Sequence, residues 1–376
     1  MAFNQSRSLY LATCGFLFLA LLGVDCVREQ AQKQVTIVDG VEVIANPALP
    51  LHKDPGRVLK VREKLRIRDT GDEFYFKGPA SPEIGPDGSI LIRQIGQLLK
   101  FSSEGAYLGD LIKPGQGPGE LEMPFGYLVE GDGIFVIDGG RYKTVHMTLD
   151  GQLIDERRLD DEAQAMTRGW FIGLQSRLPQ ERGILADMTH TFVCASRPDG
   201  RVRKTATFLG KHFRAKYNFT WDTPRWVADD GRDLLFISIS RDYAVKVLDL
   251  NAGRVVRSFS RAYPKVPYNV RPQMKAVFAD GAPRPDFEED VLELFHAGDS
   301  LWVRTSAVDP NKGQLFDVFS AEGDFLDSFF VRVNGRIIGV RQDIIFVSEE
   351  AEDGTISVVL YKNGERAGLP APRKRP

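Results

Sequence analysis

Cysteine is scarce in this chain, with three among 376 residues. Cys14 and Cys26 belong to the N-terminal segment, which leaves Cys194 alone in the rest of the sequence. A single thiol cannot form an internal disulfide, so the fold must be stabilised by its hydrophobic core. Because Cys194 lies beside Phe192 and Val193 in a strand-like run, we expect a buried, unreactive thiol.

An excess of charge of either sign is also missing, because 49 Lys and Arg residues stand against 51 Asp and Glu residues. No basic stripe interleaved with aromatic residues is present, which argues against nucleic acid as a partner. The basic run Arg373-Lys374-Arg375 lies in a Pro-rich segment, where we expect a solvated tail. The 24 Phe, 10 Tyr and 4 Trp residues indicate a large core under a nearly neutral surface.

Histidine is equally sparse, and the five residues show no short metal-ligand spacing. We interpret His146 and His190, which lie in or beside expected strands, as structural residues. No Gly-x-Ser-x-Gly motif is present, and no grouping of Ser, His and an acid can be assigned. The sequence therefore predicts no catalytic residue, no metal ligand and no cofactor. A divalent metal held by distant loops is kept as an alternative.

What the chain does contain is a repeated block with a period of roughly 40 to 70 residues. In the first copy, apolar runs at 89–92 and 98–101 are followed by Glu104-Gly105. The second copy ends at Asp150-Gly151, and four weaker copies end at Gly200, Gly253, Gly323 and Gly364. The two runs of each copy are expected to be antiparallel strands, and the glycine provides the turn toward the next strand. Such repetition is typical of a β-propeller.

Two strands are only half of a blade, since propeller blades have four. Apolar segments before and after each pair, such as 127–129 and 153–154, supply the other two. Six blades of about 50 residues need roughly 300 residues, which agrees with the stretch 59–364. The sixth copy lacks an outermost strand, and the extended segment from Val58 to Ile67 can fill that place. We therefore predict an all-β, six-bladed β-propeller closed by an N-terminal strand.

A Gly-rich turn at 113–121, followed by Met123-Pro124, resembles the turns between blades of NHL-repeat propellers. More specifically, the chain is similar to exported bacterial six-bladed β-propeller proteins, also at 40–47 and 261–268. In the turn, Gly provides positive φ, Pro fixes the backbone, and Glu120 can accept backbone N–H groups. A phosphate-binding loop is the alternative, but its Lys-Ser/Thr ending is absent. A peptide-amidating lyase of this type uses His-bound metal, and no matching histidine set is found here.

The N-terminal segment predicts export. Arg7 precedes an uncharged run at 8–24 that ends at Asp25, and this length fits a signal-peptide core. Asp25 directly before Cys26 is atypical of a lipoprotein signal, so cleavage, lipidation and retention as a membrane anchor all stay open. We expect a periplasmic, cell-envelope or secreted location. The predicted domains are a signal peptide or membrane anchor at 1–26, an N-terminal extension at 27–57, the propeller at 58–366 and a disordered tail at 367–376.

Topology predicts where a site would lie. In a propeller, the connections between second and third strands and those between blades share one face of the ring. The two longest insertions, at 210–224 and 261–289, are both connections between blades, so long loops gather there. Charged residues at the ends of the second strands join them and form either structural ion pairs or a rim that binds an anionic or zwitterionic ligand. The ligand-binding residues predicted on this face are Arg93, Asp138, Arg141, Trp221, Arg241, Asp242, Arg304 and Glu349.

Three functional hypotheses follow. The first, which we favour, is a non-enzymatic, exported propeller that binds a protein, peptide or glycan through the long-loop face. The second is a lyase, lactonase or hydrolase that uses a metal in the central funnel. The third is a structural component of the cell envelope, attached to the membrane through the N-terminal segment.

Overall fold

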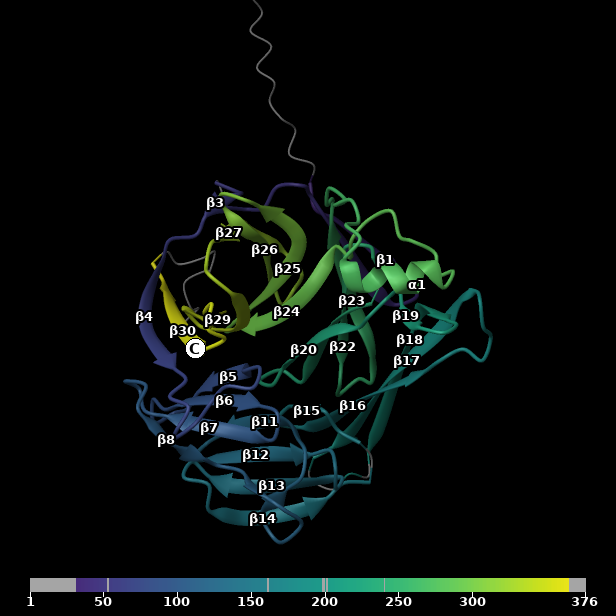
Figure 1. Cartoon of the computed structure of the whole chain (residues 1–376). Coiled ribbons are helices and arrows are strands. Elements are labelled where there is room, and N and C mark those ends of the chain that lie inside the picture. The colour runs from purple at the N-terminus through teal and green to yellow at the C-terminus, as the bar shows by residue number, and fades with distance from the viewer. Residues whose placement is uncertain are drawn as a thin grey trace, which may run out of the picture. The chain divides into compact units, whose positions relative to one another are not determined.

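The computed structural model describes residues 32–364 except 53, 161, 198, 199, 201 and 240. Within this part of the chain nearly all regular structure is β-strand (Figure 1). The helices described are the short η1 (Pro272–Met274) and α1 (Lys275–Ala279). Among the described residues, no helix is long and apolar enough to cross a membrane. The predicted signal peptide or membrane anchor at 1–26 and the predicted tail at 367–376 lie outside the described residues, as do residues 27–31 of the predicted extension and residues 365–366 at the end of the predicted propeller.

In the described part of the chain the strands form six sheets, which we number in chain order, and one small two-stranded pair. Sheet 1 consists of β5 (Ala80–Ile84), β6 (Ile90–Gln94), β7 (Gln97–Phe101) and β8 (Tyr107–Asp110). Sheet 2 consists of β11 (Pro124–Glu130), β12 (Gly133–Asp138), β13 (Lys143–Thr148) and β14 (Leu153–Arg158). Sheet 3 consists of β15 (Ala165–Met166), β16 (Trp170–Arg177), β17 (Leu185–Ser196), β18 (Arg203–Arg214) and β19 (Asn218–Thr220).

Sheets 4 to 6 each include strands from the N-terminal part of the chain. Sheet 4 consists of β20 (Arg225–Asp229), β21 (Leu234–Ser238), β22 (Ala244–Asp249), β23 (Arg254–Arg261), β2 (Val41–Asn46) and β1 (Gln34–Val38). Sheet 5 consists of β24 (Val291–Ala297), β25 (Ser300–Asp309), β26 (Gly313–Ser320), β27 (Phe325–Val331) and β3 (Arg57–Val58). Sheet 6 consists of β28 (Arg336–Arg341), β29 (Ile344–Glu350), β30 (Ile356–Asn363) and β4 (Val61–Arg68), and the small pair is β9 (Lys113–Pro114) with β10 (Glu120–Leu121).

The second strands of several sheets, such as β6, β12, β21 and β29, contain uninterrupted apolar runs because both of their faces are covered. In β6 and β29 the residues Ile90, Leu91, Ile92 and Ile345 are at most 3 % exposed. The outer strand β14 is mostly exposed instead. A continuous apolar run therefore marks a strand packed between two neighbouring sheets, rather than one with a solvated face.

Six hydrophobic clusters hold the sheets together, and each cluster is shared by two of them. They join sheets 1 and 2, 2 and 3, 3 and 4, 4 and 5, 5 and 6, and 6 and 1. For example, Phe192 lies 5.7 Å from Trp226 between sheets 3 and 4, and Phe259 lies 5.0 Å from Phe319 between sheets 4 and 5. Sheets arranged radially around a common centre, as Figure 1 shows, are the architecture of a β-propeller.

The glycines that end the repeated blocks are favoured both by the backbone conformation of the turn and by close packing. Gly105 and Gly323 lie in the turns after β7 and β26, with φ of 86° and 83°. A Cβ atom on Gly105 would lie 3.1 Å from Leu65 of β4, and one on Gly323 would lie 2.9 Å from Phe259 of β23. Each turn thus fits closely against the preceding sheet, and any other residue is disfavoured by both φ and space.

Strands from the N-terminal part lie at the outer edges of the last three sheets. β4 pairs antiparallel with β30, from Val61 opposite Asn363 to Arg68 opposite Ser357. The extended segment is divided, because Val58 pairs in parallel with Phe330 of β27 before β4 begins. β2 pairs in parallel with β23 and carries β1 outside it, so part of the predicted N-terminal extension belongs to sheet 4. Gly364, the last residue described, donates its N–H to the Lys60 carbonyl at 2.9 Å.

Candidate ligand-binding face

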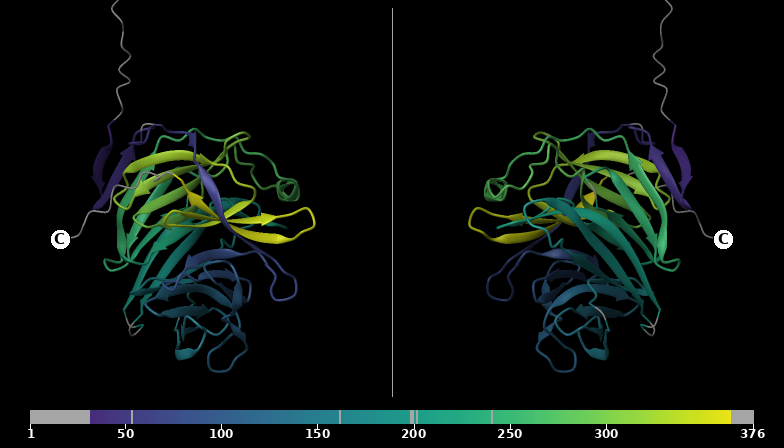
Figure 2. Two further views of the ribbon diagram at one scale, coloured as in Figure 1. Left: turned by 90° about the vertical axis from the view of Figure 1, so that its left-hand side faces the viewer. Right: turned by 90° about the vertical axis from the view of Figure 1, so that its right-hand side faces the viewer.

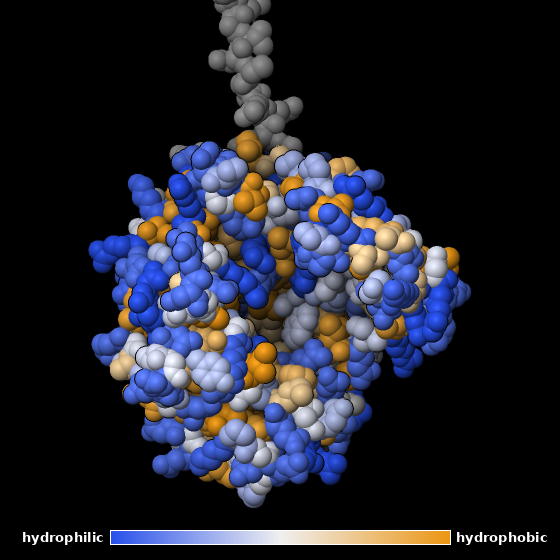
Figure 3. All heavy atoms as spheres, in the orientation of Figure 1, coloured by the Kyte–Doolittle hydropathy of each residue, from blue (hydrophilic) through white to orange (hydrophobic). Residues whose placement is uncertain are grey.

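The long connections gather on one face of the ring, where the inner strands begin and the second strands end. The connection from β23 to β24 carries η1 and α1. Figure 1 views the molecule from this face, and in Figure 2 the green segment with α1 and the yellow β29–β30 hairpin project to the same side. Figure 3 shows a central hollow on it, bordered by many hydrophilic residues. We call this side the long-loop face.

Trp221 and Arg241 lie together on this face. The Arg241 guanidinium carbon is 5.1 Å from the centre of the Trp221 ring, and its Nη1 donates to the Phe287 carbonyl at 3.0 Å. Phe219 links Trp221 to α1, because its ring lies 6.2 Å from Trp221 and 5.8 Å from Phe278. The structure thus brings two of the residues predicted from the sequence into contact, in a region where three connections meet.

Lys265 fixes the long connection to this region. Its Nζ donates to Asp290 at 2.7 Å, to Asp242 at 3.0 Å and to the Arg241 carbonyl at 3.0 Å. Burial lowers the pKa of Lys265, but the hydrogen bonds to Asp290 and Asp242 raise it by more. Burial raises the pKa of Asp290, and Lys265 offsets only part of that. Asp242, a predicted ligand residue, therefore has a structural partner.

Next to this region lies a cavity of about 470 Å³ that contains Arg304. Four guanidinium groups line it, together with one carboxylate, Glu293. The cavity is lined by Pro224, Arg225, Trp226, Arg271, Leu292, Glu293, Leu294, Arg304 and Arg336. We call it the arginine cavity.

Ion pairs orient the guanidinium groups of the arginine cavity without using all of their donors. Arg304 Nη2 lies 2.9 Å from Glu293, and Arg225 Nη2 lies 2.8 Å from Glu289. The Nε atoms of both arginines are buried and have no hydrogen-bond partner. Burial lowers the pKa of Arg304, and although Glu293 raises it, the neighbouring charges of Arg336 and Arg225 add to the decrease. A carboxylate entering here would meet oriented donors and relieve repulsion between cations.

The other residues predicted from the sequence do not line the arginine cavity. Asp138 is fully buried, and its carboxylate accepts the N–H groups of Glu122, Met123 and Gly140, each at 3.0 Å. It therefore holds a turn, which is the structural interpretation rather than the ligand-binding one. Arg141 pairs with Glu122 at 2.9 Å.

Glu349 and Arg93 are tied into the framework as well. Glu349 accepts from Arg66 of β4 at 2.7 Å and from the Tyr361 hydroxyl at 2.8 Å. Arg93 donates to the Ser81 hydroxyl at 3.3 Å, and burial lowers its pKa. These two residues are not brought into the arginine cavity.

Three residues of the arginine cavity are not among those predicted from the sequence, namely Arg225, Arg271 and Arg336. Arg225 and Arg336 are the first residues of the inner strands β20 and β28. An inner strand begins on the face where the second strand ends, so the start of each inner strand was a signal that could have found both.

The predicted Gly-rich turn is confirmed in one detail of its geometry. The N–H of Gly117 donates to Glu120 Oε2 at 2.8 Å, so the carboxylate closes the turn onto its own backbone. Gly119 has φ of 74°, and its N–H donates to Glu156 at 2.9 Å. Both carboxylates are used internally, which supports the structural interpretation of this loop.

At the opposite end of the inner strands, a cavity of about 660 Å³ forms part of the central channel. Its lining comes from the inner strands of all six sheets, including Glu83, Tyr127, Met166, Asp230, His296 and Arg341. Asp229, which ends β20, lies beside it, with Oδ2 at 3.2 Å from His296 Nε2. Burial raises the pKa of Asp229, but His296 and Arg232 together lower it by more, so it stays below its usual value.

Within the described residues, Asp229, Asp230 and His296 form the one group able to hold a metal ion. The other histidines with described side chains lie apart. His146 stacks on Phe135 with ring centres 4.0 Å apart, and His190 and His212 are buried in β17 and β18. Burial also accounts for the low reactivity expected of Cys194, because it raises the pKa of this thiol to about 12.

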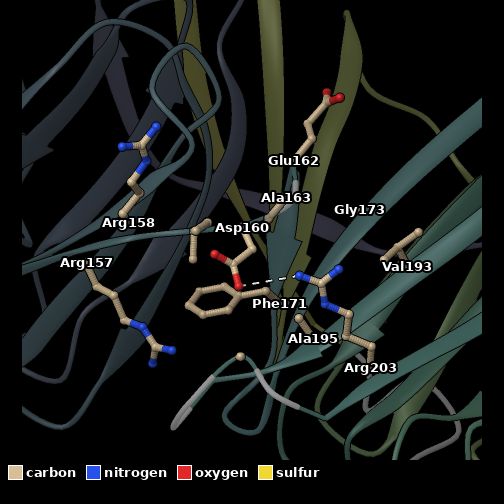
Figure 4. A pocket seen from close by; sticks show the side chains of 12 residues that line it. Arg157, Arg158, Asp160, Glu162, Ala163, Phe171, Gly173, Val193, Ala195 and Arg203 are labelled. Atoms are coloured by element: carbon tan, nitrogen blue, oxygen red, sulfur yellow. Dashed lines mark hydrogen bonds and ion pairs between the residues drawn. The ribbon is translucent and has the colours of Figure 1, made fainter.

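A smaller cavity of about 170 Å³ lies between sheets 2 and 3. Figure 4 shows Asp160 and Arg203 joined across it, at 3.4 Å, above the ring of Phe171. Part of its rim is formed by neighbours of residues 161 and 201, which are not described. It is far smaller than the two cavities at the ends of the inner strands.

No protein-family model and no curated protein matches the chain. Among solved structures it is similar to a Bacteroides fragilis protein described as exported, at 12 % identity and a TM-score of 0.48, over 85 % of this chain and 99 % of that one. The β-propeller domain of Cps50 (Swd1) from Myceliophteria thermophila matches at 8 % identity and a TM-score of 0.35, over 78 % and 99 %. BamB from Moraxella catarrhalis matches at 10 % identity and a TM-score of 0.31, over 81 % and 100 %. These values are low, so the fold and the site rest on the residues described above.

Proposed function

We propose that this protein is an exported, six-bladed β-propeller of the NHL-like type, closed by β4, that binds a partner through its long-loop face. Six sheets joined in series by six shared clusters, with β4 as the outer strand of sheet 6, support the blade count and the closure. The uncharged run at 8–24 supports a location outside the cytoplasm.

The observation that carries the binding role is the arginine cavity. Four guanidinium groups converge around one lining carboxylate, and two buried Nε donors have no hydrogen-bond partner. Glu288 and Glu289 balance part of this charge from outside the cavity, through Arg271 and Arg225. Planar guanidinium groups suit the two oxygens of a carboxylate, so an acidic ligand fits this cavity best.

An acidic peptide segment of a partner protein is favoured over a neutral sugar. A sugar ring is usually bound by stacking on an exposed aromatic face, but Arg241 covers one face of Trp221. The loops around the cavity also offer Phe287, which is 45 % exposed, as an apolar contact beside the acidic side chain.

The test is binding of a synthetic Glu-rich peptide to the purified protein. Arg304→Gln removes the guanidinium charge at the cavity and is expected to weaken binding at least about tenfold, or about 1.4 kcal/mol. Arg254→Gln is the matched control, because Arg254 is exposed at the start of β23, on the opposite face. Binding should also weaken as ionic strength rises.

Two outcomes would overturn this proposal. One is equal weakening by Arg304→Gln and Arg254→Gln, which would indicate nonspecific attraction. The other is absence of peptide binding while an oligosaccharide of uronic acids binds, which would assign the face to a glycan.

A metal-dependent lyase, lactonase or hydrolase with its site in the funnel is the second candidate. One observation favours it: Asp229, Asp230 and His296 come together beside the central channel. It requires a bound metal, whereas the peptide-binding proposal does not, so the two candidates are tested separately.

A further inference from the structure

We propose that Asp229, Asp230 and His296 form a site for one divalent transition-metal ion of the Zn²⁺ type, at the end of the central channel opposite the long-loop face. The proposal concerns binding alone and is independent of the peptide-binding function. One imidazole and two carboxylates are ligands that Zn²⁺ accepts.

The distances fit a common ion. One ligand atom from each residue can be chosen so that all three lie within 4.8 Å of one another, and Asp229 Oδ2 is 3.2 Å from His296 Nε2. Ligand atoms about 2.0–2.2 Å from a tetrahedral ion are about 3.3–3.6 Å apart. The Asp229 and His296 atoms are therefore already close to this spacing, and the ligand atom of Asp230 lies within 4.8 Å of both.

The burial of Asp229 is the second, independent observation. Its side chain is 3 % exposed, and Oδ2 and His296 Nε2, which lie 3.2 Å apart, make no hydrogen bond to any other group. The other carboxylate oxygen, Oδ1, accepts the N–H groups of Gly231 and Arg232, both at 3.1 Å. These bonds orient the carboxylate so that Oδ2 points toward His296, which is how outer hydrogen bonds hold metal ligands.

The His296 ring is held in place from the other side. It stacks on Phe236 of β21, with ring centres 6.2 Å apart and planes inclined by 18°. Asp229 and His296 come from the inner strands of sheets 4 and 5, so the spacing of the two atoms is set by the packing of these sheets.

The site opens toward the channel. Asp230 and His296 line the cavity of about 660 Å³, whereas Asp229 is buried behind them. Three protein ligands leave at least one position of a Zn²⁺ ion for a molecule from the channel, which distinguishes such a site from a closed structural one.

One nearby cation opposes metal binding. Arg232 Nε lies 3.7 Å from Asp229 Oδ2. However, Arg232 also pairs with Asp299 at 2.7 Å and lies 4.0 Å from Glu322, so carboxylates outside the site offset its charge. The competing interpretation is a simple ion pair between Asp229 and His296, which needs no metal.

The experiment is titration of the purified full chain with Zn²⁺ alone, after removal of bound metal with a chelator. We expect one equivalent to bind by calorimetry. His296→Gln and Asp230→Asn should each weaken binding at least tenfold. Asp132→Asn is the matched control, since it removes an exposed carboxylate in the turn after β11, at the same end of the inner strands, without removing a ligand or a partner of Arg232, and it should leave the affinity within twofold.

A second measurement keeps the proposal falsifiable if a variant folds poorly. Co²⁺ bound to the unaltered protein should give visible absorption typical of a site with one nitrogen ligand, and Zn²⁺ should displace it. Absence of stoichiometric Zn²⁺ binding would overturn the proposal, as would equal affinity of the unaltered protein and His296→Gln. Loss of metal binding without any loss of Glu-rich peptide binding is the expected result for two separate sites.

Discussion

The two ends of the inner strands β20 and β24 carry opposite chemistry. β20 begins at Arg225 in the arginine cavity and ends at Asp229 beside the channel, and β24 carries Glu293 near one end and His296 near the other. Both strands are short, with 5 residues in β20 and 7 in β24, so the two kinds of side chain are separated by the length of one strand. This difference shows that the sheets determine the distance between the two ends, whereas the side chains at each end determine which ligands that face can bind.

The largest expected effect is on the folding of the ring of six sheets, which supports both ends of the inner strands. Deleting residues 61–68 removes β4 and exposes β30, whose residues Val358, Val359 and Leu360 are at most 2 % exposed. We expect loss of solubility and of cooperative thermal unfolding, because an unpaired apolar edge promotes aggregation. Removal of residues 1–31 should leave a cooperatively melting protein. A soluble, cooperatively folded product from the internal deletion would contradict the closure by β4.

The next largest effect is on the free energy of unfolding, and it distinguishes arginines with a structural role from those predicted to bind the ligand. Arg261 ends β23 and pairs with the fully buried Asp317 at 2.7 Å, and Tyr243 donates to the same carboxylate at 2.7 Å. Arg261→Met leaves this charge without its cation, so we expect a loss of about 3–5 kcal/mol in the free energy of unfolding. Urea denaturation measures it. Arg254→Met, in the same strand but exposed, should change stability by less than about 0.5 kcal/mol.

A smaller effect tests the long-loop face itself. Trp221→Ala should weaken Glu-rich peptide binding by about 1 kcal/mol, because the aromatic ring both contacts Arg241 and shapes the loops around it. Arg241→Ala should do the same, while both variants keep a nearly unchanged melting temperature. Lower melting temperatures with unchanged peptide affinity would instead assign both residues to the framework.

The smallest effect concerns the pH dependence of stability and tests the buried histidines His190 and His212. Burial lowers the pKa of His190 and His212 from the ordinary 6.5, so the unfolded chain binds their protons at a higher pH than the folded chain does. Stability is therefore complete above pH 6.5 and decreases as the pH falls toward the folded pKa values. Melting temperatures at decreasing pH measure this loss, and the double variant His190→Gln/His212→Gln should reduce it. An unchanged pH dependence would show that other groups cause it.

The sequence predicted those parts of the molecule that repeat. Paired apolar runs correspond to β6 with β7 and β12 with β13. Five of the six predicted turn glycines have positive φ as expected, namely Gly105, Gly151, Gly200, Gly253 and Gly323, and Gly364 does not. The burial of Cys194 was also predicted correctly. These features are local, because strand pairing across a short turn and the needs of a turn are determined by neighbouring residues.

The site could be predicted only in part, because it depends on contacts between distant segments. Trp221 and Arg241 were assigned to one face by topology, and they are in contact. Asp138 was assigned to the same face by the same argument, but its position after a strand did not reveal that three backbone N–H groups occupy its carboxylate.

The pairing of Asp229 with His296 was beyond the sequence for a similar reason. No short spacing connects these residues, and they meet because β20 and β24 are inner strands of neighbouring sheets. Likewise, β2 pairs in parallel with β23, so β1 and β2 join sheet 4. No local sequence pattern predicts this pairing.

The central claim is that the two ends of the inner strands bind different partners, and one crossed measurement tests it most directly. The affinities for a Glu-rich peptide and for Zn²⁺ are measured on the unaltered protein, Arg304→Gln and His296→Gln. We expect Arg304→Gln to weaken peptide binding at least about tenfold and leave Zn²⁺ binding unchanged, and His296→Gln to do the reverse. If either variant weakened both affinities equally, the two ends would not be separate sites. If a variant weakened neither affinity, its residue would not belong to the site assigned to it, and the central claim would also be contradicted.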